Sequence, residues 1–365
     1  MTEGLFRLGV EREGLRVDAC GKIVQTPHPA ALFPEALRKN IATDFAEAQP
    51  ELKTGICGST EECYKELSDI TNAVLQALRA GEEYLWPYSM PALICDRSEK
   101  VCSTCEGRKE EAAYRKALYR KYDLEMLLVS GVHFNFSFAP GGYDSLLSRC
   151  PALPKDVDDG YFRILQNLRK REAECNFLFG ASPFAFDQNA PARYAREDKY
   201  SIRNSKRGYR NHCRENVDFT SKEAYQKSLL HLVETGELLG VREYYAPLRL
   251  RFSSCLGAFC PFDRIEIRFT DLNPFSPCGI TKEDMDLLIL LIMTALYENT
   301  DETSPLSLAA AEANKHLQLG MDAVCAELNR RLNAPSRADT VREKLPSLES
   351  LTALARQYTI TANIR

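Results

Sequence analysis

The stretch LLVSGVHFNFSF, residues 127–138, decides the fold that this sequence predicts. Side chains on a β-strand point alternately to its two faces. A valine and three phenylalanines share one face here, and His133, Asn135 and Ser137 share the other. The Ala-Pro-Gly-Gly run at 139–142 ends the pattern. We therefore expect a strand over residues 127–138 with one apolar face and one polar face.

Two further stretches have the same two-faced pattern. Residues 5–17, closed by Gly14, place Glu11 and Glu13 opposite an apolar face, and residues 264–270 do the same with Glu266 and Arg268. A solvated sheet surface is enough to explain any one such strand. Three strands that carry Glu-x-Glu, His-x-Asn and Glu-x-Arg on their polar faces indicate a shared site instead.

The acids on these strands point to divalent cations. Neighbouring carboxylates repel one another unless positive charge lies between them, and Mg²⁺ or Mn²⁺ takes carboxylate oxygens and accepts one imidazole. The segment ATDFAEAQPEL adds Asp44, Glu47 and Glu51, although an acidic loop would look the same. We expect two or more such ions, which would in turn bind a nucleoside triphosphate.

Phosphate binding needs a cationic source, because the chain has neither a P-loop nor a G-x-G-x-x-G motif. It would rest on the metal ions and on arginines. The candidates are Arg203, Arg249, Arg268 and the basic stretch 193–214. For that stretch taken alone, a solvated loop is the simpler interpretation.

The rest of the chain indicates a mixed fold. Ser59 to Glu62 form a capping box before a helix that runs to about Gly81, and further helices are expected over 110–122 and 160–179. Residues 244–252 read as a strand, and the chain becomes helical after a cap at Thr281. Helices and strands without a βαβ rhythm favour an α+β fold with an antiparallel sheet.

The composition is that of an ordinary soluble globular protein. The chain has 365 residues, 44% of them hydrophobic, and a formal charge of −4, which argues against a nucleic-acid or anionic-membrane surface. The apolar run MDLLILLIMTALY is shorter than the roughly 20 residues of a membrane span. Acids near the N-terminus do not fit a signal peptide, so we expect a cytoplasmic protein.

The cysteines do not suggest a disulfide framework. The chain has 13 of them, and Cys102 and Cys105 form the C-x-x-C motif. A zinc site would need a second pair at matched spacing. Free thiols are the simpler interpretation, with a metal or redox role for this pair as the alternative.

A set of motifs resembles bacterial glutamate–cysteine ligases. They occur in the family's order over about three quarters of the chain: GVEREGLRV, ATDFAEAQPEL, WPYSMP, SGVHFNFS, GYFR, FLFGASP, YSIRNSKRGY, YAPLR and IEIRFTDLNPFSP. The resemblance implies a glutamine synthetase-like curved antiparallel sheet with flanking helices. It also implies ATP-dependent formation of γ-glutamylcysteine through a γ-glutamyl phosphate, with Mg²⁺ or Mn²⁺ as cofactor.

The resemblance also implies roles for individual residues. One metal set would be Glu13, Asp44 and Glu51, and another Glu11, His133 and Glu266. Arg268 would act at the transferring phosphate, with Arg249 as a second nucleotide-binding arginine. Arg203 and Asn135 would lie near the glutamate, and Tyr114, Tyr209 and Tyr245 would line the cysteine pocket. The catalytic domain would span residues 1–280, and residues 281–365 would form a helical extension packed on it.

The chain departs from the family pattern around the substrates. The stretch between Tyr209 and Tyr245 and the C-terminal part are shorter, and Leu127 stands where the family has a glutamine. Gln49 and Pro50 replace two leucines. Because proline has no N–H, we expect that strand to lie at a sheet edge or to contain a bulge.

Three functions follow from the resemblance. The first is a glutamate–cysteine ligase whose partners are small molecules. The second is a ligase that joins glutamate or a related acid to another amine, free or held on a carrier protein. The third is a non-catalytic scaffold subunit, against which the complete set of acids argues.

Overall fold

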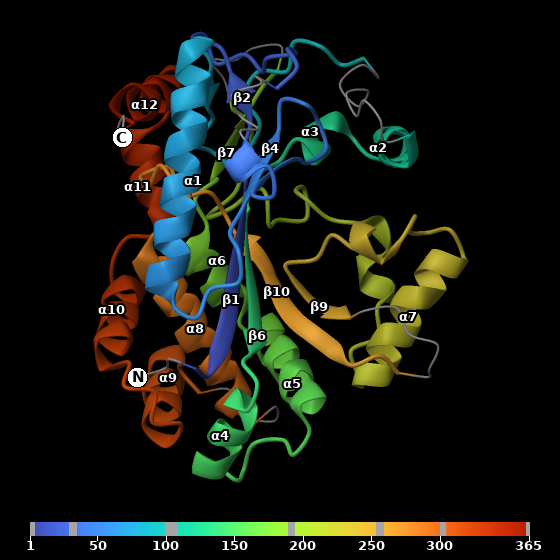
Figure 1. The fold of residues 1–365 in the computed structure, drawn as a ribbon, viewed down its shortest axis with the longest axis vertical. Coiled ribbons are helices and arrows are strands. Elements are labelled where there is room, and N and C mark those ends of the chain that lie inside the picture. The colour runs from blue at the N-terminus through green and yellow to red at the C-terminus, as the bar shows by residue number, and fades with distance from the viewer. Residues whose placement is uncertain are drawn as a thin grey trace.

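The computed structural model describes residues 4–28, 35–98, 109–188, 194–252, 259–299 and 304–362. The Cys102/Cys105 motif lies outside these residues. A six-stranded antiparallel sheet runs through the molecule in the order β3-β4-β1-β6-β10-β9 (Figure 1). Its strands are β1 Phe6–Glu13, β3 Ile41–Thr43, β4 Pro50–Lys53, β6 Val132–Phe138, β9 Leu248–Phe252 and β10 Phe262–Thr270. The expected α+β class with an antiparallel sheet is confirmed.

The apolar face of this sheet is covered by helices. Val10, Phe134, Phe136, Ile265 and Ile267 are all buried there. Four helices pack against that face or against one another behind it: α1 Thr60–Ala80, α5 Val157–Lys170, α6 Glu172–Phe179 and α8 Lys282–Tyr297 (Figure 1). Nearly every side chain of α8 is buried, so the long apolar run forms a core helix, as predicted.

The remaining elements surround this two-layer centre. Two short ribbons pair β2 Arg16–Val17 with β5 Tyr84–Leu85 and β7 Phe184–Phe186 with β8 Tyr194–Glu197. The other helices are α2 Lys109–Lys121, α3 Leu124–Leu127, α4 Gly142–Arg149, α7 Lys222–Glu234, α9 Leu306–His316, α10 Asp322–Leu332, α11 Arg337–Lys344 and α12 Leu348–Thr361.

A buried acid ties the C-terminal helices to α8. Asp284 caps the start of α8 together with Thr281, and its Oδ1 accepts hydrogen bonds from Arg331 at 2.5 Å and Arg337 at 2.6 Å. Both arginines come from the α10–α11 region, so removal of one would leave a buried charge less compensated. The helices after Thr281 are therefore joined to the core by charge as well as by apolar packing.

Several predicted boundaries were wrong. The strand expected from residue 127 begins at Val132, because Leu124 and Leu127 are buried in the helical turn α3. The helix expected over 160–179 divides at Arg171, whose side chain forms a buried ion pair with Glu298. The strand expected over 244–252 is reduced to β9, which starts after Pro247.

Two local predictions also need correction. Ser59 accepts from the Glu62 N–H, but the Glu62 carboxylate accepts from the Gly58 N–H, so the reciprocal half of the capping box is shifted by one residue. Pro50 lies in neither an edge strand nor a bulge: β4 pairs with β3 on one side and β1 on the other. It is the first residue of β4, a position where strands tolerate the missing N–H.

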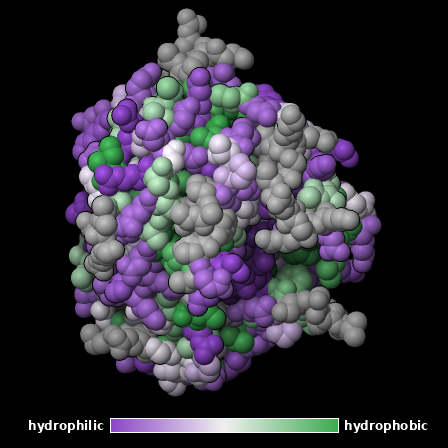
Figure 2. Space-filling model, turned by 45° about the horizontal axis from the view of Figure 1, so that its top comes forward, coloured by the Kyte–Doolittle hydropathy of each residue, from purple (hydrophilic) through white to green (hydrophobic). Residues whose placement is uncertain are grey.

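One face of the molecule shows how polar and apolar side chains are distributed on its surface. On the face in Figure 2, hydrophilic side chains predominate, and hydrophobic ones form small separate patches. None of the helices in the described ranges combines the length and the apolar character that a membrane span needs.

Candidate functional site

A cavity of about 460 Å³ lies over the polar face of the sheet. Acids line it: Glu11, Glu13, Asp44, Glu51 and Glu111. Cationic side chains line it as well: Lys53, Arg115, Arg242, Arg249, Arg251 and Arg268. Tyr114, Tyr209, Tyr245 and Leu127 are among the remaining lining residues. The cavity therefore presents opposite charges to whatever it holds.

Two acids of the first predicted metal set face each other across neighbouring strands. Glu13 of β1 lies directly opposite Glu51 of β4 in the sheet register, an arrangement that is unfavourable for like charges. Burial, and then the neighbouring Asp44, raise the pKa of Glu13 well above its ordinary value. The same two causes raise the pKa of Glu51 to about 7. Without a cation, the protein resists full ionisation of this set.

Raising the pH should destabilise the metal-free protein through Glu51. Its pKa of about 7 in the folded protein lies above the ordinary 4.5. Between these values the folded protein binds more protons than the unfolded chain, so the stability contributed here falls as the pH rises. Mg²⁺ binds the ionised carboxylate and should raise the melting temperature more at about pH 8 than at about pH 5.5. Calorimetry in EDTA and in Mg²⁺ measures both effects.

The Glu51→Gln variant is the matched control, because glutamine keeps the shape and cannot ionise. We expect its metal-free form to lose less stability across the same pH window and to gain less from Mg²⁺. The same pH slope in both proteins would mean that Glu51 ionises normally in the folded chain.

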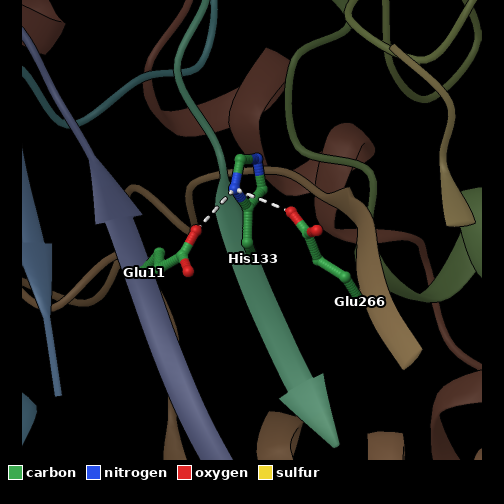
Figure 3. Close-up of side chains that lie close together, drawn as sticks. All are labelled: Glu11, His133 and Glu266. Atoms are coloured by element: carbon green, nitrogen blue, oxygen red, sulfur yellow. Dashed lines mark hydrogen bonds and ion pairs between the residues drawn. The ribbon is translucent and has the colours of Figure 1, made fainter. Parts of the chain in front are cut away.

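The second predicted metal set meets at the centre of the sheet (Figure 3). Glu11, His133 and Glu266 come from β1, β6 and β10, and each offers a ligand atom within 4.8 Å of the others. His133 Nδ1 lies 3.4 Å from Glu11 Oε2 and 3.7 Å from Glu266 Oε1. Burial and the charge of Arg268 lower the pKa of His133 to about 4, so its imidazole is neutral.

Arginines already neutralise Glu266. Arg249 Nη2 donates to both of its carboxylate oxygens at 2.8 Å, and Arg268 Nη1 donates to Oε1 at 2.5 Å. Burial disfavours the charged carboxylate, but these two arginines hold the pKa of Glu266 well below its ordinary value. Glu266 thus holds in place Arg249 and Arg268, the two arginines that are expected to bind the nucleotide and the transferring phosphate.

The donor groups at these positions fit divalent cations. Carboxylates and one neutral imidazole are the ligands that Mg²⁺ and Mn²⁺ accept. The buried His133 Nε2 forms no hydrogen bond but lies 3.4 Å from Glu13 Oε1, and Lys53 Nζ lies 2.9 Å from Glu51 Oε2. Of the two sets, Glu13, Asp44 and Glu51 have the greater need of a cation, because arginines already neutralise Glu266.

The predicted tyrosines meet in the cavity wall. The ring centres of Tyr209 and Tyr245 are 4.4 Å apart, and the Tyr209 hydroxyl accepts from Arg268 Nη2 at 3.4 Å. Tyr114, on α2, lines the same cavity. These rings form an apolar wall with polar ends next to the arginine region.

Three of the predicted site residues are not among those that line this cavity: Arg203, Asn135 and Glu266. The Arg203 guanidinium packs against Gly131, where an added Cβ would lie 2.2 Å from Nη2. Arg203 also donates to the Arg268 carbonyl at 2.6 Å. It therefore supports the strand β10, which carries Arg268, from outside the cavity. Asn135 lines an adjacent hollow, where it accepts from Arg264 Nε at 2.8 Å. Glu47, which we grouped with the acids, instead accepts from the His28 N–H.

The sequence reasoning missed several lining residues. Glu111, Arg115 and Leu118 lie on α2 with Tyr114. Their spacing of three or four residues puts them on one helical face, and that signal was present in the sequence. Arg242 lies in a 3-10 helix, Val241–Glu243, and no periodic pattern marks it.

The sequence is similar to those of several known proteins. The family described as glutamate-cysteine ligase matches residues 4–244. The glutathione biosynthesis bifunctional proteins GshAB of Streptococcus thermophilus and Listeria monocytogenes are 33% and 30% identical over 313 and 328 residues, or 84% of this chain. The matched regions are 40% and 42% of those proteins, so the chain spans less than half of their length.

Solved structures share the fold. A bifunctional glutathione synthetase from Pasteurella multocida superposes with a TM-score of 0.82 and 26% identity, over 98% of this chain and 53% of that chain. A glutamate–cysteine ligase from Francisella tularensis, in complex with AMP, superposes with a TM-score of 0.79 and 20% identity, over 98% and 89% of the two chains. At that identity, the second likeness concerns the fold alone.

Proposed function

The chain belongs to the glutamate–cysteine ligase family, and we propose that it is an ATP-dependent ligase that joins the γ-carboxyl group of glutamate to the amine of cysteine. One observation carries this proposal: carboxylates and arginines from neighbouring strands face the same cavity. Amide formation from a carboxylate and ATP must bring two anions together. Such a site needs positive charge both from bound metal ions and from side chains of the protein.

In the proposed reaction, the γ-carboxylate of glutamate attacks the γ-phosphorus of ATP. This step gives γ-glutamyl phosphate and ADP, and the amine of the acceptor then displaces inorganic phosphate. Divalent cations held by Glu13, Asp44 and Glu51, and by Glu11, His133 and Glu266, would supply charge neutralisation for the phosphates. ATP and Mg²⁺ or Mn²⁺ are therefore part of the proposal.

The protein's own part in this reaction is to place fixed positive charge. Arg268 is held by Glu266, by His133 Nδ1 at 3.1 Å and by Tyr209, so it needs little reorganisation to meet a phosphoryl group. Arg249 is fixed in the same way by Glu266. We assign Arg268 to the transferring phosphoryl group and Arg249 to the nucleotide.

The positions of the tyrosines, Arg203 and Asn135 relative to the cavity suggest how each would contribute to substrate binding. The tyrosine wall of Tyr114, Tyr209 and Tyr245 would hold the acceptor, with Leu127 adding apolar contact. Arg203 would act indirectly on the glutamate site by supporting Arg268. Asn135 lies beyond the cavity but donates to Glu11 Oε1 at 3.3 Å, and we keep its proposed place near the glutamate.

The test is MgATP turnover with glutamate and a panel of free amines, with product masses measured directly. We expect ADP release that requires glutamate and an amine together, and a γ-glutamyl amide with cysteine as the preferred acceptor. The Glu13→Gln variant sets the background. ADP release at that background with every amine would reject the ligase proposal, whereas an amide with an amine other than cysteine would change only the acceptor.

A further inference from the structure

A second cavity lies apart from the candidate catalytic cavity. Its volume is about 510 Å³, which is within the range of small-molecule sites. Among the described residues, none lines both cavities. Helices α5 and α6, which belong to the layer on the apolar side of the sheet, contribute Arg169, Glu172, Ala173 and Asn176, and residues 198–219 contribute the rest. The proposed ligase reaction therefore gives this cavity no part.

Two arginines of the second cavity already have acidic partners. Arg210 Nη2 lies 2.6 Å from Glu215 Oε1, and Arg214 Nη2 lies 3.5 Å from Glu172 Oε2. All four residues line the cavity. Their charges cancel in pairs, so these residues do not decide which charge a ligand must carry.

Two further cations of the lining leave positive charge in excess. In the described part of the chain, neither Arg169 nor Lys206 forms an ion pair with a carboxylate. The Arg169 guanidinium carbon lies 3.3 Å from the centre of the Phe219 ring, and a cation–π contact orients a charge without neutralising it. Asp198 is the remaining acid that lines the cavity. The cavity is therefore suited to an anion.

A buried amide adds a group for hydrogen bonding. The Oδ1 atom of Asn176, on α6, is buried and forms no hydrogen bond with the described residues. A buried polar atom of this kind costs free energy until it has a partner. Because an asparagine amide has both a donor and an acceptor, Asn176 can donate to an acidic group or accept from a hydroxyl of the same ligand.

Residues 201–210 contact both cavities. Lys206 and Arg210 line the second one. Arg203 donates to the carbonyl oxygen of Arg268 at 2.6 Å, and the Tyr209 hydroxyl accepts from Arg268 Nη2 at 3.4 Å. A ligand bound at Lys206 would therefore lie three residues along the chain from each of the two side chains that hold Arg268.

The turn within this segment is tightly packed. The Tyr209 N–H donates to the Arg203 carbonyl at 2.8 Å. A Cβ added at Gly208 would lie 2.1 Å from the carbonyl oxygen of Ile202 and 2.2 Å from that of Arg203, so the backbone leaves no room for a side chain there. Closely packed groups transmit displacement, and restricting Lys206 therefore also restricts Arg203 and Tyr209.

We propose that this cavity binds a small organic anion, a phosphate ester or a dicarboxylate, and that the bound anion raises ligase turnover. Its acidic groups would lie at Arg169 of α5 and at Lys206, so the ligand would join the 201–210 segment to the helical layer. Restricting that segment keeps Arg268 in the position that meets the phosphoryl group. The effect on turnover rests on the proposed ligase function, whereas the binding does not.

Binding is measured by titration calorimetry of the full chain with glycerol 3-phosphate and with succinate. We expect one of these anions to bind the parent protein, and the tighter of the two identifies the class of ligand. The double variant Arg169→Gln, Lys206→Gln should weaken this binding at least about tenfold, because both free cations are lost. Absence of binding by both anions, or equal binding by the double variant, would overturn the inference.

The double variant Lys170→Gln, Arg207→Gln is the matched control. It removes the same charge from exposed neighbouring positions of the same two segments, and neither residue lines the cavity. Its affinity for the anion should equal that of the parent. Weaker binding in the control as well would mean that net charge, and not the cavity, governs the binding, and would overturn the inference.

Turnover is measured on the same proteins with glutamate, cysteine and MgATP. We expect the anion to raise kcat/KM for MgATP at least about twofold in the parent and in the control, and to have no such effect in the Arg169→Gln, Lys206→Gln protein. Binding without a rise in turnover would overturn the inference and leave the ligase proposal standing. A parent without ligase activity would overturn the ligase proposal and the effect on turnover, while calorimetry would still decide whether the anion binds.

Discussion

Replacing Arg268 by glutamine should lower kcat by at least about a thousandfold while the protein stays folded. The guanidinium is buried at the centre of the site and hydrogen-bonded to Glu266 and Tyr209. Its charge is therefore placed before the phosphoryl group arrives. Glutamine can keep a hydrogen bond to Tyr209 but carries no charge to stabilise the transferring group. Steady-state ADP release, with glutamate and cysteine saturating, measures the loss.

Folding should survive this change because a second arginine remains on the same carboxylate. Arg249 still donates to both oxygens of Glu266, so the buried acid keeps a partner. Arg251→Gln is the control, since Arg251 lies at the partly exposed rim, 3.6 Å from Glu266, and its loss should cost less than about tenfold. A kcat for Arg268→Gln within tenfold of the parent value would remove Arg268 from the proposed catalytic role.

Replacing Glu13 by glutamine should abolish turnover and, at the same time, stabilise the metal-free protein. Glu13 is buried opposite Glu51 and beside Asp44, and burial and that neighbour oppose its ionisation. Glutamine removes a repelling charge, while its side-chain oxygen can still accept the Gly131 N–H that Glu13 Oε2 accepts at 2.9 Å. Activity should fall by more than about a hundredfold, because a proposed metal ligand is lost.

The opposite signs of these two effects make the prediction specific. Thermal melting in EDTA should give a higher midpoint for Glu13→Gln than for the parent, and Mg²⁺ should raise the variant's midpoint less. Glu47→Gln is the matched control, since Glu47 lies in the same acidic segment but outside the cavity. A Glu13→Gln protein that is less stable without metal and responds normally to Mg²⁺ would exclude Glu13 as a ligand.

The strand centres could be predicted because their chemistry alternates. Glu11, His133 and Glu266 lie on one face, and the phenylalanines and isoleucines of the same strands lie on the other, as the period of two requires. Strand ends were less predictable. Residues 127–129 are all apolar, and they would be buried in a helix as well as in a strand. No alternation of polar and apolar residues therefore marks the point where the helical turn α3 ends and the chain continues to β6.

Side chains that act through tertiary contact were harder to predict. In the sequence, Arg171 looks like an ordinary charged residue of a helix. Only the fold shows that it forms a buried ion pair with Glu298 at the break between α5 and α6. Arg203 looked like a substrate ligand, but its place behind Gly131 depends on two segments that are distant in the chain. Arg242 lies over the ring of Tyr114 in the cavity wall, a contact that depends on the fold.

The register of β1 between β4 and β6 has a consequence for how this scaffold can change in evolution. Val10 and Arg12 point into the protein while Glu11 and Glu13 point into the cavity. A single inserted residue in β1 would exchange these two faces and send acids into the core. Tyr114 lies on α2 and Arg242 in the 3-10 helix 241–243, and the loops that flank these helices can vary in length without that reversal. New acceptors should therefore arise in lineages through insertions and deletions there, while the strands keep their length.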